Sequence, residues 1–369
     1  MAIRSKTKVK RRSRTSKCNK LVGFFVGGLA VVPFILFISD SEISSLANEL
    51  NDLTPVLRSS NVDFHIDETC TNLPTVRPSG SYFLDSNIGG GVSPEGITPA
   101  FKVGSYYAEK VKYHMSTDRA NFALAKELLK GKEGGLVLDI GANQGFYTYY
   151  LATLGMNVHA FEINERNFKS LQHGAEFNPR EVADRIHVYP VGLGEKNARF
   201  SLKGANYEGF LKEGKGGSIL GVSLDCFAHH SRGKLDLSQV SFVKLDVEGF
   251  EIAVLKGGRN SLFKKRFSNM DGMVMEVGPN RWNRAQIDFA TGAAEMRNLS
   301  MLFKKSYVLL RSGAHAETCP FSIGDLVKDK KPRDVEGDVK MHAVQVDEWE
   351  PLLSFMEKKG YDCNFFYKN

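Results

Sequence analysis

Short apolar runs alternate with longer amphipathic stretches from about residue 117 onwards. Apolar runs of this length are typical of buried parallel strands, and the amphipathic stretches are typical of the helices that connect them. The pattern predicts an α/β fold with a mostly parallel sheet and helices on both faces. The expected strands are 136–140, 158–161, 186–191, 242–245, 273–277, 307–310 and 363–367, and the expected helices are 117–131, 145–154, 165–177, 250–263, 284–303 and 349–359.

Two stretches break this alternation. Residues 192–222 are rich in glycine and show no clear period, and residues 311–342 are also irregular. We expect both to form loops that set substrate specificity. For the first helix, Ser116, Thr117 or Asp118 is expected to be the N-cap, with the helix running to Gly131.

The N-terminal region contains the longest apolar segment. Leu21–Ile38 holds 18 residues without a charge, nine basic residues precede it, and Asp40 and Glu42 follow it. As a helix this segment would span roughly 27 Å, which suits a thin internal membrane. The charge asymmetry predicts a single-pass type II protein of the Golgi or endoplasmic reticulum, with residues 1–20 in the cytoplasm and the catalytic domain in the lumen. The alternative is a cleaved signal peptide, whose apolar region is usually shorter.

Composition further divides the chain. Residues 39–100 are polar and contain five prolines and Gly89–Gly91, which predicts a stem between the anchor and a domain over 101–369. The net charge is +7, from 49 basic and 42 acidic residues. Without the nine basic residues of the tail, 40 basic residues oppose 42 acidic ones, so the remainder carries about −2. This distribution argues against a nucleic-acid partner.

Five cysteines lie far apart, at positions 18, 70, 226, 319 and 363. The absence of paired short spacings excludes a zinc ribbon or a CxxC redox site. In an oxidising lumen the last four could form up to two disulfides, and the alternative is that they are buried thiols.

The first strand–turn–helix unit carries the main candidate site. Residues 137–148 read VLDIGANQGFYT, in which Gly141 permits a tight turn and Gly145 permits close approach at the start of the helix. Asn143 stands where a dinucleotide motif has its second glycine, and the third glycine is absent. Asp139 would repel a pyrophosphate but would attract a ligand with an ammonium and a sulfonium.

Glu162 ends the second strand, 21 positions after Gly141. An acidic residue at this offset reaches the ribose hydroxyls of a ligand bound at the first turn. The alternative is a surface acid that opens the next helix.

Six motifs in this order resemble the FkbM-like methyltransferase family: VLDIGANQGFYT, FEINERNFKSLQ…FN, VGLGE, SLDCF, VKLDVEGFEIAVLKGG and MVMEVGP. The resemblance covers roughly residues 135–280. It implies a class I methyltransferase (Rossmann-like) fold, S-adenosylmethionine as cofactor, and a hydroxyl acceptor that is often a sugar. It further implies that Asp139, Gly141, Asn143 and Gly145 hold the methionine end of the cofactor and that Glu162 holds its ribose. Ile163 departs from the family, which commonly has proline there.

Asp246 and Glu248 form the second candidate site, because Asp246 ends a strand at the same edge of the sheet as the glycine turn. Either could be the base that takes the acceptor's proton. They could instead bind other acceptor hydroxyls, or hold a divalent ion together with Glu276. The sequence therefore predicts an O-methyltransferase acting on a hydroxyl acceptor such as a glycan. The alternatives are a non-catalytic binding protein of the same fold, a nicotinamide-dependent oxidoreductase and a nucleic-acid methyltransferase.

Overall fold

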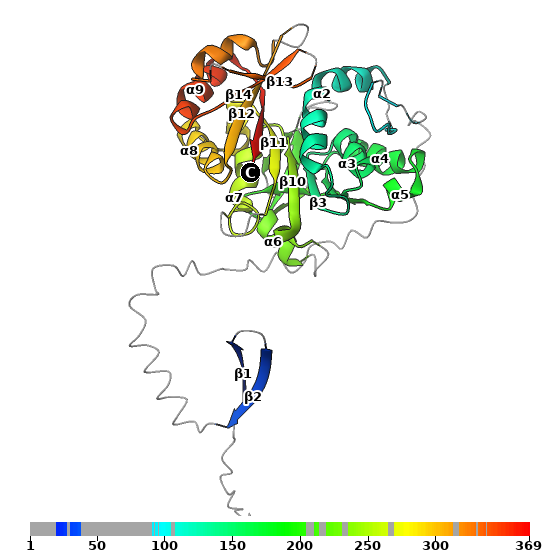
Figure 1. The fold of residues 1–369 in the computed structure, drawn as a ribbon, viewed down its shortest axis with the longest axis vertical. Coiled ribbons are helices and arrows are strands. Elements are labelled where there is room, and N and C mark those ends of the chain that lie inside the picture. The colour runs from blue at the N-terminus through cyan, green and yellow to red at the C-terminus, as the bar shows by residue number, and fades with distance from the viewer. Residues whose placement is uncertain are drawn as a thin grey trace, which may run out of the picture. The chain divides into compact units, whose positions relative to one another are not determined.

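The computed structural model describes residues 20–27, 30–37, 91, 93–94, 96–104, 108–203, 210–213, 219–230, 235–264, 269–312, 317–329, 331–336 and 338–369. The chain divides into two units, residues 1–65 and 66–369 (Figure 1). The predicted basic tail lies outside the described residues apart from Lys20, and so does most of the predicted stem. Ile97, which lies in the predicted stem, is buried in a core cluster of the second unit together with Phe101 and Val103.

The apolar N-terminal segment forms a β-hairpin, so the predicted transmembrane helix over Leu21–Ile38 is wrong. Strand β1 (Lys20–Gly27) pairs antiparallel with β2 (Ala30–Phe37). The segment is rich in valine, isoleucine and phenylalanine, which favour strands, and it contains glycines and Pro33, which disfavour a helix interior. Within the described residues, no helix has the length and apolar character needed to cross a membrane.

A nine-stranded sheet forms the centre of the second unit, in the order β13-β14-β12-β15-β11-β10-β3-β4-β5. Strands β5, β4, β3, β10 and β11 are parallel, and β15 lies antiparallel between β11 and β12. This confirms the predicted α/β fold with a mostly parallel sheet. The strands are β3 (Leu136–Ile140), β4 (Asn157–Phe161), β5 (Ile186–Tyr189), β10 (Val240–Leu245), β11 (Gly272–Val277), β12 (Lys305–Arg311), β13 (Arg333–Asp334), β14 (Val339–Ala343) and β15 (Cys363–Lys368).

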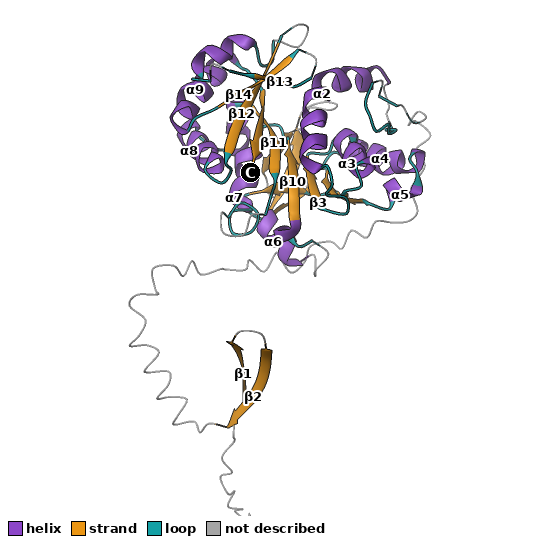
Figure 2. Ribbon diagram, viewed as in Figure 1, coloured by secondary structure: helices purple, strands orange, loops and turns teal. Residues whose placement is uncertain are grey.

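Helices cover both faces of this sheet (Figures 1 and 2). One face carries α2 (Ala108–Leu129), α3 (Phe146–Thr153), α4 (Glu165–Gly174) and α5 (Arg180–Ala183). The other carries α6 (Leu224–His230), α7 (Glu251–Gly257), α8 (Phe289–Ser300) and α9 (Trp349–Lys359). The strands β3 and β10 are neighbours although about a hundred residues separate them, so the sheet's topological switch point lies between them. Ligands of open α/β sheets bind at this point, outside the carboxyl ends of the strands.

A second sheet lies within residues 192–223, where the sequence predicts a loop over 192–222. Its four strands, in the order β6-β9-β7-β8, are β6 (Gly192–Gly194), β7 (Ala198–Lys203), β8 (Phe210–Glu213) and β9 (Ile219–Ser223). A Cβ at Gly257 of α7 would lie 1.9 Å from the carbonyl oxygen of Gly194, so α7 approaches β6 closely only because residue 257 is glycine.

Three predicted helices have other bounds. Ser116–Asp118 lie inside α2, so they are not its N-cap. The helix predicted over 250–263 ends at Gly257, where Gly258 follows. The helix predicted over 284–303 is a 3₁₀ helix (Pro279–Ala285) followed by α8, because Asp288 accepts the backbone N–H of Thr291 and so caps a new helix.

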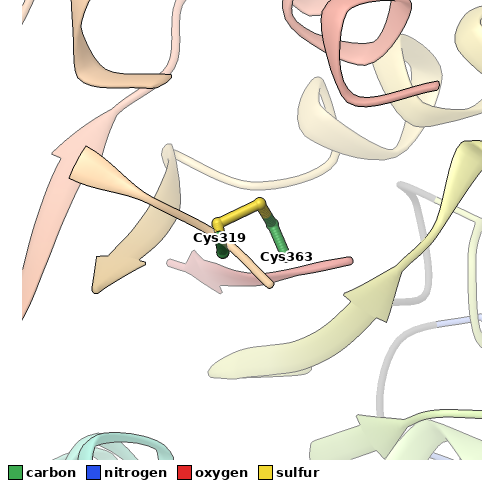
Figure 3. The surroundings of a disulfide bond; sticks show 2 residues. All are labelled: Cys319 and Cys363. Carbon is green, nitrogen blue, oxygen red and sulfur yellow. A yellow bond between two sulfur atoms is a disulfide. The ribbon is translucent and has the colours of Figure 1, made fainter. Parts of the chain in front are cut away.

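A disulfide joins Cys319 to Cys363 at the start of β15 (Figure 3). Both cysteines are buried, with at most 1% of their surface exposed. Cys226 is also disulfide-bonded. Of the two possibilities left open by the sequence, these cysteines therefore form disulfides.

Candidate active site

The glycine turn after β3 is held by close backbone contacts. The backbone N–H groups of Gly141 and Ala142 both donate to the carbonyl oxygen of Phe161 at the end of β4. Gly141 has a φ of +82°, and a Cβ there would lie 1.7 Å from the carbonyl oxygen of Asp246. Both the backbone conformation and the contact therefore require glycine. This contact brings the turn directly against the residue that follows β10.

Glu162 points to this turn. Its carboxylate accepts the backbone N–H of Asn143 and the backbone N–H of Asn164, each at 2.7 Å. The N–H that would face a pyrophosphate in a dinucleotide-binding protein is therefore bonded to an acid of this chain. A carboxylate offers about four acceptor positions, so two remain for a ligand.

Burial raises the pKa of Glu162 to about 7, although the backbone N–H groups of Asn164 and Asn143 favour its ionised form. Only 6% of the residue is exposed. Near neutral pH Glu162 therefore exists in both protonation states, and a ligand that donates hydrogen bonds to the carboxylate would favour the ionised one.

Asp139 lies beneath the turn and is fully buried. The hydroxyl of Thr148 donates to its Oδ2 at 2.6 Å, and Lys244 Nζ lies 3.8 Å from its Oδ1. Burial raises the pKa of Asp139, while Lys244 and Thr148 oppose this shift.

Lys244 connects the two motifs. Its Nζ donates to the carbonyl oxygen of Gly141 at 2.7 Å and lies 3.3 Å from Asp246 Oδ2. Burial disfavours its charge, but Asp246 and Asp139 outweigh that effect and raise its pKa. Lys244 therefore carries a permanent positive charge that holds Asp246 beside the turn.

A cavity opens where these residues meet, at the carboxyl ends of β3, β4 and β10. The structure brings Gly141, Asn143, Glu162, Asp246 and Glu248 together in its lining. The other two predicted cofactor residues, Asp139 and Gly145, are not in this lining. The missing side chain of Gly145 instead makes room for Tyr149 and Leu171, since a Cβ would lie within 2.8 Å of each.

Glu248 lies beside two arginines. Arg281 Nη1 lies 2.7 Å and Arg284 Nη1 lies 3.4 Å from its Oε2. Arg281 also pairs with Asp362 and lies 3.7 Å from Glu276. Within the described residues, no group of three His, Cys, Asp or Glu side chains is arranged to hold a metal ion.

Glu251, which our sequence analysis did not identify, stabilises the loop that carries Glu248. Its carboxylate accepts the backbone N–H groups of Val247 and Gly249 at 3.2 and 2.9 Å. Burial raises the pKa of Glu251 to about 7. Lys244 was also missed, although the presence of a lysine within the apolar strand 242–245 could have indicated a role in the site. Arg281 gave no such signal, because Glu248 and Asp362, with which it pairs, lie far from it in the sequence.

The charge of the cavity indicates which class of cofactor it can bind. Its lining includes the carboxylates of Glu162, Asp246 and Glu248, and among its described residues there is no lysine or arginine. Ile163, Val191 and Leu193 supply apolar walls. An acidic cavity with apolar walls fits a cationic nucleoside such as S-adenosylmethionine and disfavours a pyrophosphate.

Comparison with known families agrees. The family model described as the methyltransferase FkbM domain matches residues 139–363, which is more than half of the chain. The chain belongs to the FkbM methyltransferase family. As an FkbM methyltransferase it uses S-adenosylmethionine as cofactor.

Solved structures similar to this FkbM methyltransferase also include methyltransferases. An O-methyltransferase from Bacillus cereus in complex with SAH is 13% identical, with a TM-score of 0.34 over 62% of this chain and 81% of the other. An S-adenosylmethionine-dependent methyltransferase from Agrobacterium tumefaciens is 9% identical, with a TM-score of 0.38 over 76% and 71%. A comparison with curated proteins gives no match.

Proposed function

We propose that the protein transfers a methyl group from S-adenosylmethionine to a hydroxyl oxygen of a sugar acceptor. The observation that carries this proposal is the position of Asp246, which lines the cavity beside the glycine turn and is paired with Lys244. The cofactor supplies an electrophilic methyl group on its sulfonium. A hydroxyl is a weak nucleophile until a base removes its proton, and a carboxylate at this place is suited to that role.

Some residues of the site bind the cofactor, and others take part in the reaction. Glu162 holds the ribose diol through its two free acceptor positions, and Gly141 and Asn143 bound the methionine end. Asp139 supports the turn from below through Thr148 and Lys244. Asp246 accepts the proton of the acceptor hydroxyl, and Lys244 keeps the carboxylate directed at the cavity.

Glu248 positions the acceptor rather than acting as the base. Its Oε2 is engaged by Arg281 and Arg284, so this oxygen is already bonded and is not free to take the acceptor's proton, although burial and Asp246 raise the pKa of Glu248. Together with Glu276 and Asp362, these side chains give one edge of the site many hydrogen-bonding groups. Such an edge suits an acceptor with several hydroxyls, as a sugar has.

Methyl transfer from labelled S-adenosylmethionine tests the proposal. The full chain should label free hydroxyls of oligosaccharides but not the same oligosaccharides after O-acetylation. Asp246→Asn should lower kcat by about 10²–10⁴-fold, as for loss of a general base, with affinity for S-adenosylhomocysteine within threefold or so of wild type. Labelling of nitrogen or sulfur sites in place of hydroxyls, or an unchanged kcat for Asp246→Asn, would contradict it.

We further infer that this domain works in the lumen of the secretory pathway. The Cys319–Cys363 disulfide and the disulfide-bonded Cys226 support this location, because structural disulfides persist in oxidising compartments. Protease treatment of intact microsomes tests it. The domain should be degraded only after detergent opens the membrane, and degradation without detergent would place it in the cytosol.

A further inference from the structure

Arg311 is a buried arginine that has no counter-ion among the residues that the structure describes. Only 5% of the residue is exposed. Its backbone N–H donates to Cys319, but its guanidinium forms no hydrogen bond or ion pair with any residue that the structure describes. A charge that keeps little contact with water and has no partner is costly, and arginine side chains in such places are normally paired. None of the Arg311 nitrogens is among the fully enclosed unpaired atoms of the described residues, so its N–H donors remain within reach of a ligand.

The position of Arg311 places these donors beside the catalytic edge of the sheet. Strand β12 is parallel to β11, because both are antiparallel to β15, so its last residue lies at the same edge as Asp246. Leu309, two residues earlier on the strand, packs in the same core cluster as Tyr147 and Phe242. Alternate residues of a strand face the same side, so Arg311 faces α2 and α3.

Tyr147 connects Arg311 to the reacting centre. Its ring lies 5.3 Å from Lys244 Nζ, and its phenol interacts electrostatically with both Asp246 and Arg311. Strand β12 is three positions away from β10, or ~14 Å at the usual strand spacing. Arg311 is also absent from the lining of the cofactor cavity. In the sheet, β12 therefore lies on the opposite side of β10 from β3 and β4, whose ends form the cofactor cavity.

Asn121 of α2 is a second observation that indicates a ligand in the same region. Its Nδ2 donates to Asp118 at 3.3 Å, while its Oδ1 is buried and has no partner. Asn121 also lies close enough to Tyr147 to affect the phenol. One unpaired donor group and one unpaired acceptor atom therefore flank Tyr147.

We propose that Arg311 binds an anionic group of the acceptor, so that the substrate is a charged sugar carrying a carboxylate, a sulfate or a phosphate. This rests on the proposed function, because it names the class of acceptor for the same site. A neutral hydroxyl would satisfy some of the N–H donors but would not balance the buried charge. A carboxylate, sulfate or phosphate does both and fits the fork of the guanidinium.

Calorimetry on the full chain, saturated with S-adenosylhomocysteine, tests the proposal. The probes are D-glucuronate, glucose 6-sulfate and glucose 6-phosphate, with glucose as the neutral reference. At least one anionic sugar should bind about tenfold or more tightly than glucose, as expected for a charge-assisted contact, and the three probes show which anion is preferred. Arg311→Met should abolish this preference, and Arg311→Lys should retain part of it.

Arg333→Met is the matched control, because Arg333 is half exposed and paired with Glu127. It should leave the preference unchanged, and thermal melts should show that both methionine variants are folded. If none of the three anions binds more tightly than glucose, or if Arg311→Met keeps the preference, the proposal is wrong. If Arg311→Met instead loses affinity for S-adenosylhomocysteine, Arg311 serves the cofactor. Failure of the wild-type chain to bind S-adenosylhomocysteine would count against the proposed function itself.

Discussion

The carboxylate of Glu162 accepts the backbone N–H of Asn143 at 2.7 Å, which joins the end of β4 to the turn after β3. This contact gives Glu162 two roles, since it both fixes the turn and faces the cavity. Glu251 is comparable in burial and pKa but does not line the cavity. The two acids therefore form a matched pair for mutagenesis.

The first prediction concerns cofactor binding and pH. Because the pKa of Glu162 is about 7 and a diol binds to the ionised carboxylate, affinity for S-adenosylhomocysteine should fall on acidification. Between pH 7.5 and pH 6 the loss should approach ~10-fold. Calorimetry should show that Glu162→Gln weakens binding and removes most of this pH dependence, while Glu251→Gln preserves it. Identical pH profiles for wild type and Glu162→Gln would contradict the assignment.

The second prediction concerns stability without cofactor. Glu162 and Glu251 each have a folded pKa of about 7 against an ordinary value of 4.5. The folded protein therefore binds more protons than the unfolded chain between these values, so the free energy of unfolding falls as pH rises from about 4.5 to 7. Each group should contribute up to ~3 kcal/mol to this fall. In urea titrations, each glutamine variant should gain stability relative to wild type between pH 5 and pH 8, and a constant difference would rule this out.

The third prediction separates contact from backbone conformation in the glycine turn. Gly141 and Gly131 have similar positive φ values, +82° and +77°, but a Cβ at Gly131 would meet nothing within 4 Å. Gly131→Ala should cost ~1–2 kcal/mol of unfolding free energy from backbone strain alone. Gly141→Ala should cost clearly more, because it also displaces Asp246, and should reduce turnover. Equal losses in chemical denaturation would show that the contact with Asp246 is unimportant.

The fourth prediction concerns the disulfide. Cys319 and Cys363 are 44 residues apart in sequence, and closing a loop of this length lowers the entropy of the unfolded chain by an amount worth about 4 kcal/mol. Cys319→Ser and Cys363→Ser should each lower the free energy of unfolding by a large part of this value. In reducing agent, which also breaks the bond of Cys226, wild type and both variants should have nearly equal stability, whereas unchanged denaturation curves for the variants without reducing agent would mean that the Cys319–Cys363 bond adds no stability.

The sequence predicted the parallel sheet and five of the residues that line the cavity, because both depend on local spacing, whereas Asp139 and Gly145 lie outside the lining. Gly141, Glu162 and Asp246 lie at strand ends, where parallel topology brings them together. The pairing of Arg281 with Glu248 could not be predicted, since the two side chains meet only after β11 is in place. The small sheet over 192–223 was missed because its strands are only three to six residues long and their glycines resemble those of loops.

The hairpin formed by β1 and β2 shows a limit of predicting structure from hydropathy. An uncharged run of 18 residues predicts a membrane helix by length and hydropathy, but the same run is rich in residues that favour strands. Hydropathy is an average over the segment and does not distinguish these two outcomes.

The place of β15 in the sheet has a consequence for biosynthesis. Residues 363–368 come after every other strand in the order of translation, yet they lie between β11 and β12 in the folded sheet. The β12–β14 region therefore cannot join the parallel strands until residue 368 has left the ribosome. Until then the nascent chain exposes two unpaired strand edges, which a chaperone would need to shield from other chains.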